Sequence, residues 1–201
     1  GSGVVGQTLG GGLRQLGHTV AIGSRTGRPV ENWDGAVGTF SDVAAASDTL
    51  VLAVKGGVAE ELVASISAEL AGKTVLDTTN PIADLPPVDG VLRYFTTFEE
   101  SLMERLQAAA PQAHFVKAFS SVGNARMVNP VYEAGMPSMF IAGNDSDAKA
   151  EAAAITRSLG WDVEDMGTAV AARAIEPLCM LWCIPGLRGG SWTHAFKLLK
   201  D

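Results

Sequence analysis

The chain opens with Gly1-Ser2-Gly3-Val4-Val5-Gly6, a complete G-x-G-x-x-G pattern. In dinucleotide-binding folds these glycines allow a tight turn, close approach of the backbone to a pyrophosphate, and close packing of the following helix. The free amides and the dipole at that helix's N-terminus favour an anion. The stretch therefore predicts a nucleotide-phosphate site, against the alternative of a flexible glycine-rich terminus. A strand normally precedes this pattern, so we expect about six residues of apolar strand before Gly1.

Short apolar runs alternate along the chain with alanine- and leucine-rich stretches. Such runs predict buried parallel strands, and the stretches between them predict helices. The predicted strands are Thr19–Ile22, Thr49–Val54, Thr74–Leu76, His114–Phe119, Ser138–Ile141 and Asp162–Met166, and the predicted helices are Leu9–Leu16, Ser41–Ala46, Ala59–Leu70, Ser101–Ala109 and Asp147–Leu159. This alternation predicts an α/β fold with a Rossmann-like, doubly wound, mostly parallel sheet. Its ligand crevice should lie at the carboxyl ends of the strands.

The last part of the chain differs from the rest in composition. We expect a nucleotide-binding domain over residues 1–167 and a short helical extension over residues 168–201. Apolar residues recur at helical spacing over Thr168–Ile184, and Leu187, Trp192 and Phe196 follow. This is more apolar surface than one small domain readily covers, so we expect the extension to form a homodimer.

Composition excludes several classes of protein. The 201 residues carry a formal net charge of -7, which opposes binding to nucleic acid. We count no apolar run near the roughly 20 residues of a membrane span, so we expect no membrane partner. The two cysteines, Cys179 and Cys183, are expected to be reduced, which is typical of a cytoplasmic protein. No histidine lies at ligand spacing beside them, so no metal site is predicted.

The predicted strand Thr19–Ile22 leads into Gly23-Ser24-Arg25-Thr26, about 20 residues after the glycine pattern. An NAD-binding fold usually places an acid here on the ribose 2′-hydroxyl, and none is present. Arg25 can instead offer a bidentate fork to a 2′-phosphate, with hydroxyls beside it and Arg28 as a second cation. The pattern predicts NADP; the alternative is a solvated loop arginine.

The next two predicted strands also end in small or polar residues. After the first, Val54-Lys55-Gly56 would let a ribose–nicotinamide unit lie against the backbone, and Lys55 is either a cofactor contact or a solvated turn lysine. After the second, Asn80 is either a cofactor or substrate contact or a turn former, while Asp77 should order the loop. The loop 117–124 should face the nicotinamide side, with Phe119 either core or platform.

Several of these segments together resemble the NADPH-dependent reductases of the 8-hydroxy-5-deazaflavin coenzyme. The resemblance rests on Gly1–Gly6, Gly17-His18, Gly23-Ser24-Arg25, Asp77–Pro81, Lys117-Ala118-Phe119, Ile141–Asp145 and Ala172–Leu178. It covers nearly the whole chain, and the family also includes cytosolic reductase domains of membrane ferric reductases. It implies the Rossmann fold, NADP as cofactor, and direct hydride transfer to the deazaflavin as co-substrate.

The resemblance also implies roles for individual residues. It carries Gly1, Ser2, Gly3, Val4 and Val5 to the phosphates, Ser24 and Arg25 to the 2′-phosphate, and Val54, Asn80 and Ala118 to the ribose–nicotinamide side. It implies no catalytic acid or base, because positioning of the two rings is the catalysis.

Two departures separate the chain from the family's usual pattern. Gly10-Gly11-Gly12 stands in the first helix where alanine and leucine are usual, and Ser120-Ser121 replaces an asparagine–threonine pair. The second departure leaves the acceptor open. The alternatives are an NADPH-dependent reductase of a flavin, a quinone or a ferric complex, and a noncatalytic NADP-sensing module.

Overall fold

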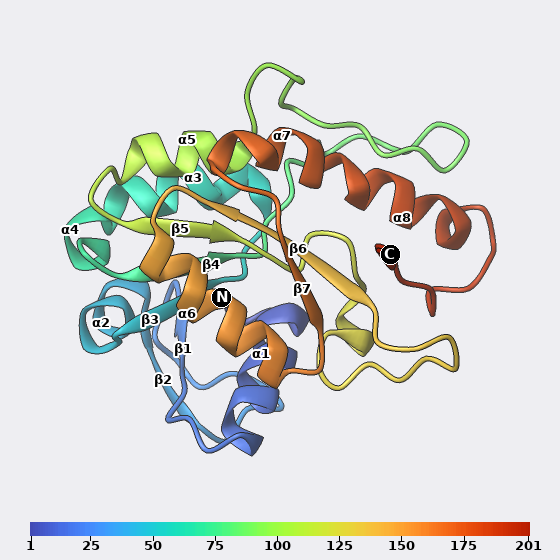
Figure 1. Ribbon diagram of the computed structural model, residues 1–201. Coiled ribbons are helices and arrows are strands. Elements are labelled where there is room, and N and C mark those ends of the chain that lie inside the picture. Colours follow the sequence, from blue (N-terminus) through green and yellow to red (C-terminus); the bar gives the residue numbers. More distant parts are fainter.

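The computed structural model describes residues 1–201, and every strand lies in one α/β unit (Figure 1). The strands are β1 Ala21–Ser24, β2 Ala36–Thr39, β3 Thr49–Leu52, β4 Thr74–Asp77, β5 His114–Lys117, β6 Ser138–Gly143 and β7 Asp162–Asp165. The α-helices are α1 Val4–Gln15, α2 Phe40–Ala46, α3 Gly56–Ser65, α4 Ser67–Leu70, α5 Leu102–Ala109, α6 Ser146–Ser158, α7 Ala172–Ile175 and α8 Pro177–Leu187. Two 3-10 turns, η1 Asn124–Arg126 and η2 Ala169–Ala171, complete the elements.

The strands form two separate sheets, with orders β1-β2 and β3-β4-β5-β6-β7. Every pair is parallel except β5–β6, which is antiparallel. The expected doubly wound, mostly parallel sheet is therefore confirmed, but the prediction that every strand is parallel is wrong for β6 and β7, which run opposite to β3, β4 and β5. The cause is the connection from β5 to β6, which contains only the short turn η1. A parallel crossover usually contains an α-helix, and none lies between β5 and β6.

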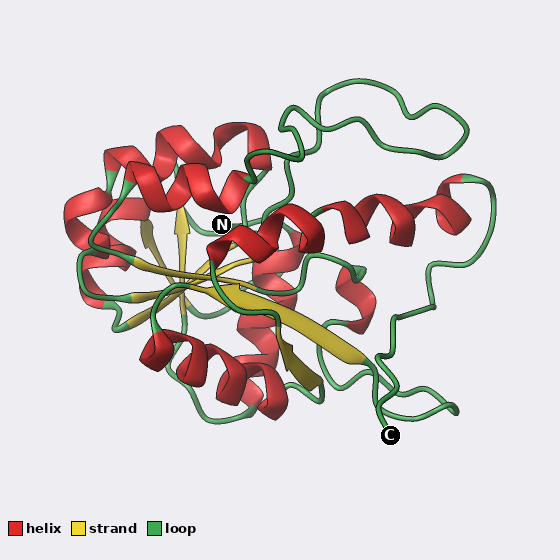
Figure 2. Ribbon diagram, turned by 45° about the horizontal axis from the view of Figure 1, so that its top comes forward, coloured by secondary structure: helices red, strands yellow, loops and turns green.

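Helices cover both faces of the larger sheet, as Figure 2 shows. One apolar core joins α3 and α5 to the sheet and includes Val63, Leu106 and Phe115, each at most 1% exposed. The other core joins α1 and α6 to the opposite face and includes Leu9 and Trp161. A strand that is covered on both faces has a nearly continuous apolar sequence, so such strands can be predicted from the sequence.

Capping side chains begin several of the helices. Asp145 accepts hydrogen bonds from two amides of α6, as the sequence suggests. For α2 the expected start at Ser41 is wrong, because Thr39 is the N-cap. Thr39 forms a capping box with Asp42, so the helix begins at Phe40.

The C-terminal extension packs against the domain rather than standing free. Its stretch Ala169–Leu187 is long and apolar enough to cross a membrane by length and composition, which corrects our expectation that no stretch qualifies. Core helices of globular proteins meet the same criterion. The only charges in the stretch, Arg173 and Glu176, pair with Glu104 and Lys117 of the domain.

Candidate nucleotide-binding site

The glycines of the opening loop have different surroundings. A Cβ at Gly1 would lie 2.0 Å from the carbonyl oxygen of Ala53, and a Cβ at Gly6 would lie 2.0 Å from that of Gly1. A Cβ at Gly3 would meet nothing within 4 Å. Gly1 and Gly6 are thus required by protein packing. Gly3 borders open space, where a ligand's pyrophosphate could approach the backbone.

The N-terminus of α1 presents free amides beside this loop. Gly3 is the N-cap, with no side-chain cap and no acid in the first turn. The Gln7 side chain donates to the carbonyl oxygen of Ser2, which holds the loop against the helix. Ser2, Val4 and Val5 lie at this N-terminus, and their binding of an anion stays a prediction.

The carboxyl end of β1 carries the residues expected at a 2′-phosphate. Ser24 is buried, and its hydroxyl accepts the amide of Gly27 at 3.0 Å, so it shapes the loop. The side chains of Arg25 and Arg28 are exposed and form no ion pair with the protein. Both guanidinium groups are free to bind an anionic ligand.

The residues expected on the nicotinamide side come together at the carboxyl edge of β3, β4 and β5. Gly56 packs so closely on Asn80 that a Cβ would lie 2.0 Å from its carbonyl oxygen. The Asn80 side-chain amide donates to the carbonyl oxygen of Ser120 at 3.0 Å. Val54 is half-buried and Lys55 is exposed at the start of α3.

Ala118 and Phe119 are exceptions to the expected arrangement. Ala118 is 0% exposed and belongs to the core, so its side chain offers no surface to a cofactor here. Phe119 is also buried and packs edge-to-face on Trp161, which makes it core rather than platform.

Two buried polar atoms at this edge have no hydrogen-bond partner in the protein. They are Asn80 Oδ1 and Ser120 Oγ. Buried polar atoms are usually paired, and an unmade bond costs about 1–3 kcal/mol. These atoms fit a bound ligand with polar groups at this edge, such as the ribose or carboxamide of a nicotinamide nucleotide.

A charged cluster that we did not foresee lies beneath the same edge. The Lys117 ammonium is 2.5 Å from an Asp77 oxygen and 2.9 Å from a Glu176 oxygen, and all three side chains are almost fully buried. Burial alone would lower the pKa of Lys117, but the two carboxylates outweigh it and raise the pKa. The sequence signal was a lysine in register with an aspartate on the neighbouring apolar strand.

Each carboxylate of the cluster also orders backbone. Asp77 accepts the amide and the hydroxyl of Thr79, as expected for a loop-ordering residue. Glu176 accepts the amides of Leu102 and Met103 at the N-terminus of α5. The cluster therefore ties the loop after β4, the strand β5 and the C-terminal extension together. It positions the edge and has no exposed group to react.

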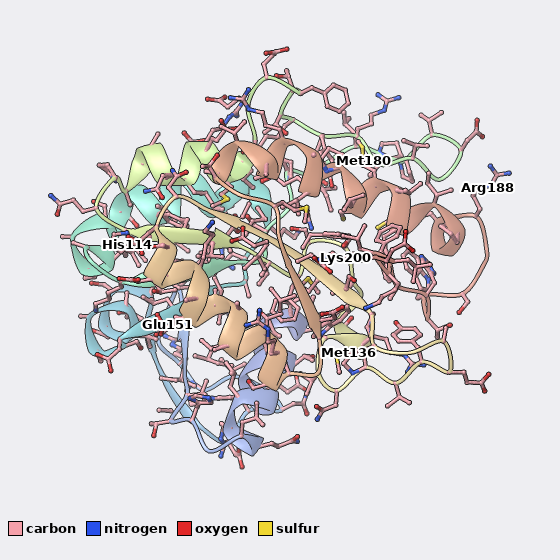
Figure 3. The ribbon with its side chains drawn as sticks, in the orientation of Figure 1. His114, Met136, Glu151, Met180, Arg188 and Lys200 are labelled. Carbon is pink, nitrogen blue, oxygen red and sulfur yellow. The ribbon has the colours of Figure 1, made fainter.

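A small cavity of about 230 Å³ lies over this cluster, between the loop after β4 and the C-terminal extension. Tyr94, Phe98 and Arg173 line it, together with Met180 of α8, which Figure 3 labels. The cavity borders the candidate site, because its lining residue Tyr94 forms an antiparallel β-bridge with Ile82, and Ile82 is two residues after Asn80.

Comparison with known proteins identifies the family of the chain. Residues 1–81 match the family described as NADP oxidoreductase, coenzyme F420-dependent. A crystal structure of an F420-dependent NADP reductase from Arthrobacter sp. FB24 is 32% identical, covers 100% of this chain and 97% of its own, and superposes with a TM-score of 0.89. The chain belongs to this family. Coenzyme F420 is the 8-hydroxy-5-deazaflavin coenzyme of the reductases that the sequence resembles.

Two further relatives are more distant. Metalloreductase STEAP3 of Rattus norvegicus is 26% identical over 210 residues, and the chain spans only 41% of its length. A pyrroline carboxylate reductase of Plasmodium falciparum with NADP bound is 15% identical, covers 83% of this chain and 55% of its own, and has a TM-score of 0.56. At that identity the second likeness shows the fold alone. Its family and its fold together identify the protein as an NADP-dependent oxidoreductase.

Proposed function

We propose that the protein transfers a hydride between NADP(H) and the 8-hydroxy-5-deazaflavin coenzyme F420. The observation that carries the proposal is a set of three anchors: the free helix amides behind Gly3, the unpaired guanidinium of Arg25 after β1, and the unsatisfied Asn80 Oδ1 after β4. They match the phosphates, the 2′-phosphate and the nicotinamide end of NADP in turn.

When bound, NADPH would supply a hydride from its nicotinamide ring, and the acceptor would take up that hydride together with one proton from solvent, leaving NADP⁺. This chain's residues bind and orient. The N-terminus of α1 would hold the pyrophosphate, Ser24 with Arg25 and Arg28 the 2′-phosphate, and Val54, Lys55 and Asn80 the ribose–nicotinamide side. No titratable side chain is needed at the reacting atoms, because two correctly placed rings exchange hydride directly.

The Lys117–Asp77–Glu176 cluster would support this geometry from below. It fixes the end of β4, from which Asn80 projects, and ties the extension that covers the site. We assign these residues a positioning role.

A second acceptor class is favoured by one observation. The 26% identity to a metalloreductase supports a ferric complex as the alternative, whereas Ser120-Ser121 beside the site only leaves the acceptor open. We further propose that the protein is located in the cytoplasm, because its two cysteines are free and free cysteines are typical of reducing compartments. Nucleic acid is not expected to bind at a net charge of -7.

The deciding experiment mixes the purified protein with NADPH and, separately, with F420, a flavin, a quinone and a ferric chelate, and follows NADPH absorbance. NADPH carrying deuterium at the transferred position is used next. We expect oxidation with F420 fastest and the deuterium in reduced F420. Faster oxidation with the ferric chelate would establish the alternative. Tight NADPH binding without turnover of any acceptor would instead support a sensing module.

A further inference from the structure

A close contact joins α8 of the C-terminal extension to the loop after β5. The ring of Trp182 in α8 lies directly on Gly123, so that a Cβ at Gly123 would be 2.7 Å from the Cη2 atom of the ring. Gly123 has a φ of -77° and a ψ of 148°, an extended conformation that any residue adopts. The backbone therefore does not require a glycine at this position, but the approach of Trp182 does.

The last part of the chain holds Trp182 in place. The indole Nε1 of Trp182 donates to the carbonyl oxygen of His194 at 2.9 Å, and the two rings stack with 5.0 Å between their centroids. His194 Nε2 in turn lies 2.7 Å from the carbonyl oxygen of Trp182. The ring of Trp192 packs on the same indole at 5.3 Å. These contacts leave the Trp182 ring, which is 5% exposed, little freedom to move.

The loop that Trp182 contacts also carries the unpaired polar atoms of the candidate site. Ser120, three residues before Gly123, is 3% exposed, and its hydroxyl oxygen has no partner in the protein. The carbonyl oxygen of Ser120 accepts the side-chain amide of Asn80 at 3.0 Å, and Asn80 Oδ1 is likewise unpaired. A shift of the loop would move this carbonyl oxygen and turn the Asn80 amide with it. The position of Gly123 therefore affects both unpaired atoms.

The loop begins at a strained residue. Phe119 has a φ of 57°, in the left-handed region that residues with a side chain rarely adopt. Such a conformation persists only where the surrounding structure holds it. At the start of the loop, Phe119 packs edge-to-face on Trp161, and at its end Trp182 presses on Gly123. A strained loop that lost its second contact would be able to relax.

We propose that Trp182 is a positioning residue for the nicotinamide end of the bound cofactor. Through Gly123 it holds the loop 120–123, so that Ser120 Oγ and Asn80 Oδ1 stay in place for the polar groups of that end. This inference rests on the proposed NADP(H) site but not on the identity of the acceptor. The 2′-phosphate end of the site, which follows β1, should not depend on Trp182.

The test measures the binding of two ligands by calorimetry: NADP⁺, and adenosine 2′,5′-bisphosphate, which has the 2′-phosphate end but no nicotinamide. Gly123→Ala places a methyl group against the Trp182 ring, and Trp182→Phe removes the part of the ring that lies on Gly123. We expect each variant to weaken NADP⁺ binding by at least about fivefold and to change bisphosphate binding by less than about twofold. In the double variant the smaller ring leaves room for the methyl group. Adding Gly123→Ala to Trp182→Phe should therefore cost less than about twofold further.

Gly12→Ala is the matched control. Its methyl group would lie 2.6 Å from the side chain of Val128, a similarly close contact at another place in the fold. This variant should change the binding of NADP⁺ and of the bisphosphate by the same factor. Tm is measured for every variant. Trp182→Phe only removes atoms from the contact, so it tests the inference even if Gly123→Ala does not fold.

Several outcomes would overturn the inference. One is that Trp182→Phe leaves NADP⁺ binding unchanged, or weakens both ligands equally. Another is that Gly123→Ala costs as much in the Trp182→Phe background as in the unchanged chain. If the unchanged protein bound neither ligand, the proposed nucleotide site would be wrong, and this inference with it. No acceptor is present in these measurements, so they do not depend on whether hydride reaches F420.

Discussion

The Lys117 ammonium lies 2.5 Å from the Asp77 carboxylate, with both side chains 0% exposed. Removing the lysine leaves two buried carboxylates without a counter-charge, so Lys117→Met should lower the free energy of unfolding by about 3–5 kcal/mol. Urea unfolding at neutral pH measures this. Arg105→Met, which breaks the exposed pair with Glu100, is the control and should cost less than about 1 kcal/mol. If Lys117→Met lowered the free energy of unfolding by less than about 1 kcal/mol, the buried ion pairs of Lys117 would not stabilise the fold.

Gly3 separates nucleotide binding from folding. Gly3→Ala adds a methyl group into open space, so stability should change by no more than about 1 kcal/mol. The methyl should hinder the pyrophosphate, and we expect NADPH to bind at least about tenfold more weakly in calorimetry. Gly11→Ala, also in open space but in the middle of α1, should raise stability by about 0.5–1 kcal/mol with unchanged NADPH binding.

Arg25 should decide between the two nicotinamide cofactors. Charge-assisted hydrogen bonds to a 2′-phosphate contribute about 1.5–3 kcal/mol, so NADPH should bind at least about tenfold more tightly than NADH. Arg25→Ala should remove most of this difference by weakening NADPH alone. Arg157→Ala, an exposed arginine on α6, is the control. If Arg25→Ala weakened the binding of NADPH and NADH equally, Arg25 would not contact the 2′-phosphate.

The C-terminal extension should make a homodimer. Leu181, Leu187 and Trp192 are 55%, 40% and 44% exposed, an apolar surface that a second copy would bury. We propose that light scattering at micromolar concentration gives twice the chain mass, and that Leu181→Glu gives a monomer. Val131→Glu, at a residue 78% exposed in the loop before β6, should leave the dimer intact. A monomer for the unchanged chain would refute the interface.

Glu104 should make stability depend on acidity. Its hydrogen bonds to Arg173 lower the pKa of Glu104 to about 2. A lowered pKa in the folded state stabilises above the ordinary value near 4.5, and this stabilisation is lost as pH falls toward 2. Glu104→Gln keeps the cap of α5 but removes the charge, so it should destabilise clearly at pH 7 and much less at pH 2.5. Glu60→Gln, exposed on α3, should be neutral at both values in urea unfolding.

Local patterns were enough to predict most of the larger sheet. Thr74–Leu76 and His114–Phe119 are apolar on both faces, and this was visible without knowing their partners. β2 was missed because Ala36–Thr39 is short and contains a glycine, so only its pairing with β1 makes it a strand. The reversal of β6 depends on how the chain returns from β5, which residue types do not specify.

The candidate site was predictable where a motif places backbone and less so where packing decides. Arg25 and Asn80 lie at strand ends, as their positions in the sequence indicate. Ala118 follows β5 in the same way, yet it is buried under the loop that it begins. Lys117 and Glu176 are 59 residues apart in the sequence numbering, and their contact depends on how α8 packs on the sheet, which no local signal reports.

The residues expected to hold the two ends of the cofactor lie in different sheets. Ser24 and Arg25 follow β1, whereas Val54 and Asn80 follow β3 and β4. A dinucleotide held at both ends would contact both sheets at once. Its binding free energy would then add to the stability of both sheets together, including the short pair β1–β2.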